Sequence, residues 1–207
     1  MAYLSDRHRD YRQCPACGLV FVPAHQHLDA AAEKAIYDRH ENSLDDTGYR
    51  RFLSRMADPL LARLERPSLG LDFGCGPAPL LARMLEAAGH EVAQYDLYYR
   101  PDEAVLEARY DFITATETIE HLAAPGSTFA RWVSMLVPGG WLGIMTKRVI
   151  DREAFAHWHY KNDLTHIAFF SDATFSFLAR RHALLLDIVD KDVVLFRKPP
   201  KPHESQA

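Results

Sequence analysis

The stretch LDFGCG, residues Leu71–Gly76, determines which fold this chain is expected to adopt. An apolar run leads into two glycines one residue apart, and an amphipathic segment starts at Pro77. This order is typical of a strand, a tight turn and a helix, because glycine lets the backbone turn sharply and approach a ligand closely. The stretch therefore predicts the first strand and turn of a nucleoside-binding α/β unit.

A second signal is Asp96, which stands 20 residues past Gly76 and ends the apolar segment 91–95. A carboxylate at the tip of a second strand can accept hydrogen bonds from the two hydroxyls of a ribose. The spacing of turn and acid therefore favours a ligand that contains a nucleoside.

Two kinds of nucleoside ligand compete for this turn. A dinucleotide needs a third glycine and free backbone N–H groups at the helix start, but Ala78 stands there between Pro77 and Pro79, and proline has no N–H donor. Asp72 would repel a phosphate and suits a cationic ligand. A sulfonium nucleoside is thus favoured, and an NAD-binding oxidoreductase remains the less favoured alternative.

Apolar segments and helical patterns alternate along the rest of the chain. Strands are expected over 69–73, 91–95, 110–115 and 141–145, and a closing hairpin over 184–197. Helices are expected over 29–40, 49–64, 77–88, 127–136 and 171–181, with a break between the first two at residues 46–48. This alternation predicts an α/β fold, a Rossmann-like doubly wound and mostly parallel sheet with an antiparallel C-terminal hairpin. The segment 97–109 is too short for a full crossover helix plus a strand, so a truncated helix and a missing or vestigial strand are expected there.

Two further motifs complete a family resemblance. The segments YDFITATETIEHL (110–122) and LVPGGWL (136–142), together with the glycine turn and Asp96, resemble class I S-adenosylmethionine-dependent methyltransferases, in the small single-domain branch near ubiquinone-type O-methyltransferases. The resemblance covers residues 69–197 and implies S-adenosylmethionine as cofactor. The chain departs from the family pattern at Ala78 and in the shortened segment 97–109. In the family, the corresponding region often supplies an acidic partner for the adenine amino group.

The resemblance also implies roles for particular residues. Asp72 would hold the amino end of the cofactor, the glycine turn would pass its methionine part, and Asp96 would hold the ribose. The implied cofactor-binding set is Asp72, Phe73, Gly74, Cys75, Gly76, Asp96, Leu97, Thr116 and Glu117. Taken by itself, Cys75 is better interpreted as a small buried residue.

Methyl transfer from a sulfonium needs mainly alignment of the reactants, and a base only if the acceptor is a hydroxyl or a protonated amine. Histidine suits that role near neutral pH. The candidates are His121, after the fourth expected strand, and His159 and His166, in the aromatic-rich loop 147–170 that forms the acceptor lid in this fold. The alternatives are aromatic packing for the loop and, for His121, a structural hydrogen bond to a loop carbonyl.

The pair Cys14-x-x-Cys17, followed by glycine, is half of a zinc ribbon. A tetrahedral site needs two more ligands, which His25 and His27 could supply, with His8 as another candidate. Zinc is therefore a candidate second cofactor. The alternative is a degenerate remnant that holds an N-terminal hairpin.

Composition limits the partners and the compartment. The net charge is −4, with 48% hydrophobic and 25% charged residues, which gives no general attraction to nucleic acid or to an anionic membrane. No apolar stretch approaches the roughly 20 residues of a membrane span, and the polar start and three cysteines favour a cytoplasmic protein. We expect an enzyme that methylates a small-molecule acceptor on oxygen or nitrogen. The alternative is a macromolecule-directed methyltransferase or a binding module that reads its target with the N-terminal knuckle.

Four segments are expected along the chain: a Cys-x-x-Cys knuckle over 1–28, a helical lead-in over 29–66, the methyltransferase domain over 67–198 and a disordered Pro-rich tail over 199–207. The sequence indicates no oligomeric state.

Overall fold

A computed structural model describes residues 1–39 and 43–201, and its centre is a six-stranded sheet in the order β5-β4-β6-β7-β10-β9. The first four strands are parallel, and the last two form an antiparallel hairpin against β7. The strands are β4 (Leu69–Phe73), β5 (Glu91–Tyr95), β6 (Tyr110–Thr116), β7 (Leu136–Met145), β9 (Leu185–Ile188) and β10 (Val193–Arg197). The expected α/β fold with a mostly parallel sheet is confirmed.

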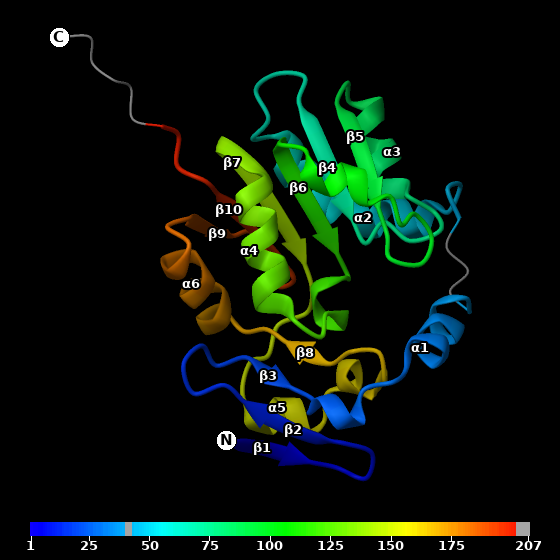
Figure 1. Cartoon of the computed structure of the whole chain (residues 1–207), viewed down its shortest axis with the longest axis vertical. Coiled ribbons are helices and arrows are strands. Elements are labelled where there is room, and N and C mark those ends of the chain that lie inside the picture. Colours follow the sequence, from blue (N-terminus) through cyan, green and yellow to red (C-terminus); the bar gives the residue numbers. More distant parts are fainter. Residues whose placement is uncertain (40–42, 202–207) are drawn as a thin grey trace, which may run out of the picture.

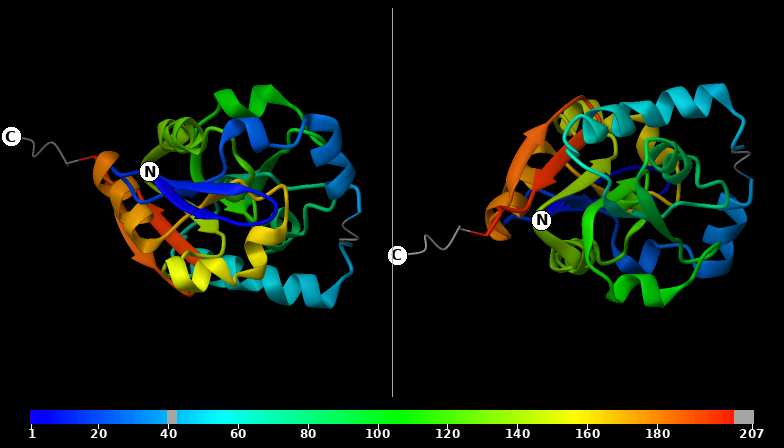
Figure 2. Two further views of the ribbon diagram at one scale, coloured as in Figure 1. Left: turned by 90° about the horizontal axis from the view of Figure 1, so that it is seen from below. Right: turned by 90° about the horizontal axis from the view of Figure 1, so that it is seen from above.

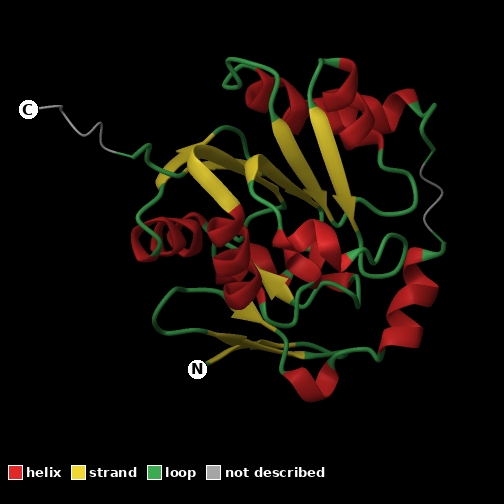
Figure 3. Ribbon diagram, turned by 45° about the horizontal axis from the view of Figure 1, so that its top comes forward, coloured by secondary structure: helices red, strands yellow, loops and turns green. Residues whose placement is uncertain are grey.

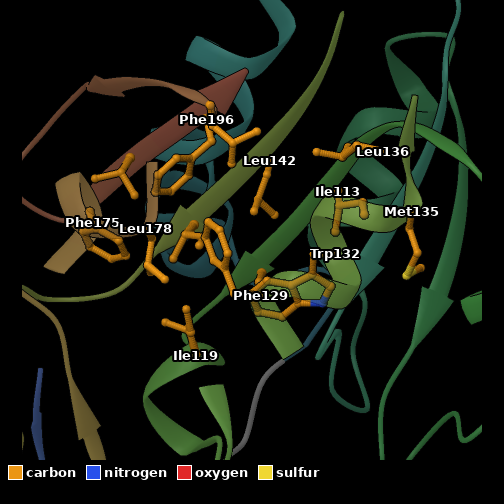
Figure 4. Packing of buried hydrophobic residues seen from close by; sticks show 14 of the residues in the cluster. Ile113, Ile119, Phe129, Trp132, Met135, Leu136, Leu142, Phe175, Leu178 and Phe196 are labelled. Atoms are coloured by element: carbon orange, nitrogen blue, oxygen red, sulfur yellow. The ribbon is translucent and has the colours of Figure 1, made fainter. Parts of the chain in front are cut away.

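Helices flank this sheet on both sides (Figures 1 and 3). One face carries α2 (Thr47–Leu61) and α3 (Leu80–Ala87), and the other carries α4 (Pro125–Met135) and α6 (Asp172–Arg181). The apolar residues of each helix recur at helical spacing and face the strands, as Phe129 and Trp132 of α4 do in Figure 4. The core is therefore two apolar layers divided by the sheet.

The segment after β5 contains no strand, and the structure describes all of it. Residues 97–109 hold one short 3-10 helix, Glu103–Glu107, capped by Asp102, so that β5 is the edge of the sheet. The expected missing strand is confirmed. With no further strand beyond β5, the segment after Asp96 returns directly to β6.

Several boundaries differ from the sequence expectation for local reasons. Strand β7 begins at Leu136 instead of 141, because a register shift against β6 accommodates the Pro-Gly-Gly turn. Helix α2 begins at Thr47, because the Asp46 carboxylate caps the N–H groups of Gly48 and Tyr49. The loop 147–170 is more regular than expected, since it contains α5 (Arg152–Ala156), the 3-10 helix His159–Asn162 and β8 (Ala168–Phe169).

A second sheet lies beyond the carboxyl ends of the parallel strands. Its order is β1-β2-β3-β8, all antiparallel, with β1 (Ala2–Ser5), β2 (Asp10–Gln13) and β3 (Val20–Phe21). Seen from below, the N-terminal strands lie across the end of the central sheet (Figure 2). Its fourth strand, β8, comes from the loop 147–170 after β7. The N-terminal segment 1–28 and this loop therefore share one sheet. The segment boundaries at 28, 66 and 198 remain predictions.

Helix α1 (Ala30–Tyr37) follows the small sheet after a 3-10 helix, Ala24–Gln26, and its first turn is capped by Asp29. The expected end of this helix at His40 and most of the expected disordered tail, 202–207, lie outside the described residues. Within the described part of the chain, every helix is too short or too polar to traverse a bilayer.

Candidate active site

The glycine turn adopts a backbone that other residues rarely take. Gly74 and Gly76 have φ of +75° and +63°, and the Gly74 N–H donates to the Tyr95 carbonyl at 2.8 Å. A Cβ at Gly74 would lie 2.3 Å from the Thr118 hydroxyl oxygen, whereas one at Gly76 would meet no atom of the described residues within 4 Å. The turn thus packs tightly on Thr118 at Gly74 and leaves open space at Gly76.

Asp96 faces this turn from the end of β5. Its Oδ2 accepts the Gly76 N–H at 3.0 Å, and its Oδ1 accepts the N–H groups of Tyr98 and Tyr99 at 2.9 and 3.0 Å. A carboxylate has about four lone-pair positions, so the residue is fixed in place and can still accept a bond from a ligand. Leu97, the next residue, is 64% exposed beside it.

Asp72 places a buried carboxyl under the turn. Thr114 of the neighbouring strand donates to its Oδ1 at 2.8 Å. Burial raises the pKa of Asp72 to about 6, and the charge of Asp96 adds to this. The ring of Phe73 packs against the core on Tyr95, with ring centroids 4.9 Å apart.

Two other residues of the implied cofactor set place a polar side-chain atom in the interior. Burial raises the pKa of the Cys75 thiol to about 12, which makes it a small packing residue and not a nucleophile. The Thr116 hydroxyl is buried and has no hydrogen-bond partner among the residues that the structure describes. A buried polar atom of this kind calls for a partner that the protein does not itself provide.

A polar cluster follows β6 and faces the end of β7. Glu117 has a φ of +47°, a left-handed conformation that is strained for a side chain of this kind and is often found at functional sites. The Tyr160 hydroxyl donates a short hydrogen bond to Glu120 and lies 3.3 Å from Glu117 Oε2 and 3.2 Å from the Thr146 hydroxyl. Burial raises the pKa of both glutamates, and for Glu117 the charge of Glu120 adds to the effect.

Two of the three candidate histidines belong to this cluster. His121 Nδ1 lies 3.1 Å from the Thr165 carbonyl, His166 Nδ1 lies 2.7 Å from the Tyr160 carbonyl, and the two ring centroids are 4.7 Å apart. Burial lowers the pKa of His166 to about 4, so that it is neutral at pH 7. His159 is exposed instead, with Nε2 3.1 Å from the Lys147 amine.

The small sheet holds the loop that carries His166. The guanidinium of Arg9 is buried and donates to the carbonyls of Leu164, His166 and Asp163 at 2.9–3.0 Å, and to that of Lys161. Four loop carbonyls therefore depend on one side chain of the N-terminal hairpin, which fixes the position of the loop relative to the central sheet.

The Cys14-x-x-Cys17 pair forms a tight turn, in which the Gly18 N–H donates to the Cys14 carbonyl at 2.9 Å. The structure does not bring His25 or His27 to it, and His27 Nε2 instead lies 2.9 Å from the Val22 carbonyl. Within residues 1–39 and 43–201, the one group of three or more side chains arranged like metal ligands is Glu120, His121 and His166. The zinc set expected at the knuckle gains no support.

Helix α1 is attached to the segment after Asp96. Tyr98 donates to Glu33 at 2.5 Å and Tyr99 donates to Asp38 at 2.7 Å, while the Tyr37 ring packs on His121 at 5.3 Å. The helix therefore connects the segment after Asp96 with the ring of His121. Nothing in the sequence pattern of residues 29–40 indicates this position.

The sequence pattern did not single out Glu120 or Tyr49 as site residues, and it indicated Tyr160 only as one member of the aromatic-rich acceptor loop. The repeat of a glutamate at a spacing of three, followed at once by His121, would have singled out Glu120. Tyr49 lies in the first turn of α2, where burial and the charges of Asp72 and Glu117 raise the pKa of its hydroxyl to about 12.

Lys147 also lines a cleft of about 850 Å³. Its walls come from the segment 147–152, the start of α6 and the turn between β9 and β10. Lys147 lies 5.1 Å from the centre of the Tyr160 ring, so the cleft adjoins the polar cluster. Its size is that of pockets that hold small organic molecules.

Residues 41–183 match the model of a family described as a methyltransferase domain. Among solved structures, a protein of Pyrococcus horikoshii has 15% identity and a TM-score of 0.59 over 81% of this chain and 99% of its own. An O-methyltransferase family protein of Burkholderia thailandensis has 14% identity and a TM-score of 0.55, with 84% of this chain and 61% of its own length covered. The magnesium protoporphyrin IX methyltransferase of Synechocystis, solved with bound S-adenosylhomocysteine, has 13% identity and a TM-score of 0.53 over 81% and 94% of the two chains. No curated protein matches the sequence.

Proposed function

Because the chain belongs to the methyltransferase domain family, we propose that it transfers a methyl group from S-adenosylmethionine to a small-molecule acceptor, on oxygen or nitrogen. One observation carries the proposal: Asp96 Oδ2 lies 3.0 Å from the Gly76 nitrogen, at the carboxyl ends of two adjacent parallel strands. A nucleoside would bind at this point of an α/β sheet. The membership of a ubiquinone-type branch remains a prediction.

The residues around the glycine turn fit this cofactor. The open space at Gly76 admits a ligand against the backbone, Asp96 would accept a hydrogen bond from a ribose hydroxyl, and the buried Asp72 would complement the charge of the amino end. The Thr116 hydroxyl has no hydrogen-bond partner in residues 1–39 and 43–201, and Thr116 and Glu117 would line the mouth of the pocket. The bound cofactor supplies an activated methyl group, so the protein contributes mainly alignment of the reactants and exclusion of water.

The acceptor would lie between the polar cluster and the cleft beside Lys147. Glu117 is the proposed base, because a carboxyl group with a raised pKa accepts a proton well near neutral pH. His121 and His166 would orient the polar group of the acceptor, and His159 is left out because it is exposed and away from the other two. The small-molecule assignment rests on the size of the cleft, about 850 Å³.

Nothing in the described structure favours the alternative in which the N-terminal knuckle reads a macromolecule. The strands of that segment pack against α5 and the acceptor loop through Tyr11, Phe155 and Phe169, which are all buried. Their role in the structure is to hold the loop in place.

The function is tested by titrating the protein with S-adenosylmethionine and S-adenosylhomocysteine in a calorimeter, with NAD as the comparison. Binding of either sulfur nucleoside and no heat with NAD is the expected result. Strong binding of NAD alone would overturn the proposal. Mass spectrometry of a metabolite extract treated with enzyme and cofactor then identifies the compound that gains a methyl group.

Cofactor affinity is expected to fall as the pH drops below about 6. Asp72 titrates with a pKa of about 6, and its anionic form attracts the cofactor's amino group, so affinity is full above that pH and declines below it. Well below this pKa, the loss of cofactor affinity approaches tenfold per pH unit, because protonating Asp72 costs about 1.4 kcal/mol more for each unit by which the pH falls. Calorimetry between pH 5 and 7.5 measures it.

Two variants of this site act as controls. Asp72→Asn should give a flat and weaker profile, and Thr114→Val should move the midpoint to higher pH, because Thr114 donates the hydrogen bond that lowers the pKa of Asp72. Identical slopes for the wild type and Asp72→Asn would contradict the assignment.

Removing the Tyr160 hydroxyl is expected to destabilise the fold. Tyr160→Phe leaves a buried carboxylate oxygen of Glu120 without its donor, at a cost of about 1–3 kcal/mol. Tyr110→Phe is the control, because it removes a hydroxyl that donates to the neutral Val105 carbonyl. Urea denaturation compares the two, and an equal or larger loss in Tyr110→Phe would be evidence against a special role for Tyr160.

A further inference from the structure

We propose that Glu120, His121 and His166 bind a divalent transition-metal ion. Their ligand atoms all lie within 4.8 Å of one another. Metal bonds of about 2.0–2.2 Å place tetrahedral ligands about 3.3–3.6 Å apart, so small rotations of the side chains would complete the site. The binding of the ion does not depend on the proposed function.

Hydrogen bonds to the backbone already orient both imidazoles for this task. A carbonyl oxygen can only accept, so the contacts of His121 with Thr165 and of His166 with Tyr160 put the proton on Nδ1 of each ring. The lone pair is then on Nε2 in both residues. Histidines that bind metals nearly always donate their other N–H to a carbonyl or a carboxylate in this way.

Glu120 provides the second, independent observation. Its side chain has no exposed surface, and its Oε2 has no hydrogen-bond partner among the described residues, while Oε1 is held by Tyr160. An unpartnered oxygen on a buried carboxyl is costly to keep. A cation between this oxygen and the two imidazoles would provide the missing partner.

The donor set indicates the class of metal. Two imidazole nitrogens and one carboxylate suit Zn²⁺, Mn²⁺, Co²⁺ or Fe²⁺, whereas Mg²⁺ and Ca²⁺ prefer sites made of oxygen ligands. Three protein ligands leave at least one position open, as in catalytic and not in structural zinc sites.

The open coordination position gives the metal ion a role in the methyl transfer, and this role rests on the proposed function. The cluster joins the proposed acceptor site through Tyr160, which contacts both Glu117 and Glu120. A hydroxyl of the acceptor bound at the metal would be more acidic and would be held still, and Glu117 would take its proton as the methyl–oxygen bond forms and the methyl–sulfur bond breaks. The acceptor class is then a phenol or another hydroxyl-bearing small molecule.

Metal binding is tested on the full chain after treatment with a chelator. Calorimetric titration with ZnCl₂, MnCl₂ and CoCl₂ should show one ion per chain, and MgCl₂ should bind at least tenfold more weakly. The isosteric variant Glu120→Gln, and His121→Gln and His166→Gln, should each lose at least tenfold in affinity. His159→Gln is the matched control, with a histidine outside the cluster, and should bind as the wild type does.

The outcomes separate the possible sites. Retained binding in Cys14→Ser/Cys17→Ser supports the proposal, and its loss there would assign the ion to the knuckle. Absence of binding to the wild type, or undiminished binding in Glu120→Gln, would overturn the proposal. Titration of the metal-free protein with S-adenosylhomocysteine keeps the two proposals apart: failure of that binding counts against the proposed function, and failure of metal binding alone counts only against this site.

Discussion

Replacing Asp96 with alanine is expected to weaken the binding of S-adenosylmethionine at least tenfold and to lower turnover at cofactor concentrations below saturation. Three backbone N–H groups already bond to this carboxylate, so the ribose would lose one hydrogen bond to a charged acceptor, worth about 1.5–3 kcal/mol. Every 1.4 kcal/mol is a factor of ten in affinity, so this bond accounts for a loss of roughly 10- to 150-fold. Calorimetric titration with the cofactor gives the dissociation constant.

The same substitution removes the acceptor for three backbone N–H groups, those of Gly76, Tyr98 and Tyr99. Asp96→Asn separates the two effects, because it keeps one carbonyl oxygen for the backbone but loses the charge. It should bind with intermediate affinity. Asp102→Ala is the control, since this exposed residue caps a 3-10 helix in the same segment. A dissociation constant for Asp96→Ala within threefold of the wild type would refute the ribose contact.

The central sheet could be predicted from the sequence because its signals are local. Strands β4 and β5 have the bounds expected from their apolar runs, since each run is followed directly by a turn or a polar residue that ends it. The missing strand after β5 follows from chain length alone. Helix starts were placed less well, because Asp46 was interpreted as a breaker when its carboxylate is the cap of α2.

The small sheet could not be predicted, because its information is not local. Strands β3 and β8 have two residues each and lie almost 150 positions apart, so neither has a recognisable period. Arg9 is a polar residue in a polar segment, and only the fold shows that it is buried under four loop carbonyls. Strand β3 forms because β8, in the loop 147–170, pairs with it.

The two halves of the site differ in the same way. The meeting of the glycine turn with Asp96 could be predicted, because turn, strand end and acid follow one another within 26 residues, from Leu71 to Asp96. The polar cluster after β6 depends on Glu120 and Tyr160, which are 40 residues apart and meet only in the folded chain. The sequence indicated histidines in this region but did not separate the exposed His159 from the paired His121 and His166.

Gly74→Ala is expected to have the largest effect on stability. The new Cβ would lie 2.3 Å from the Thr118 hydroxyl oxygen in a left-handed backbone. The backbone conformation costs about 1–2 kcal/mol, and overpacking adds about 1–3 kcal/mol. For a chain of this size, the sum lowers the melting temperature by about 4–20 °C. Differential scanning calorimetry measures the shift, and cofactor binding should be lost with it because the turn must move.

Gly76→Ala is the matched control, because Gly76 has a similar φ and no atom in the described part of the chain lies within 4 Å of the new Cβ. It should show only the backbone cost, about 2–8 °C. Adding Thr118→Ala to Gly74→Ala removes the two closest atoms and should recover part of the loss, while the same change in the Gly76→Ala background should recover nothing. This difference isolates the contact between the turn and Thr118 from the strain of the backbone. Equal losses for the two alanine variants would mean that backbone strain alone, and not the packing on Thr118, requires glycine at the turn.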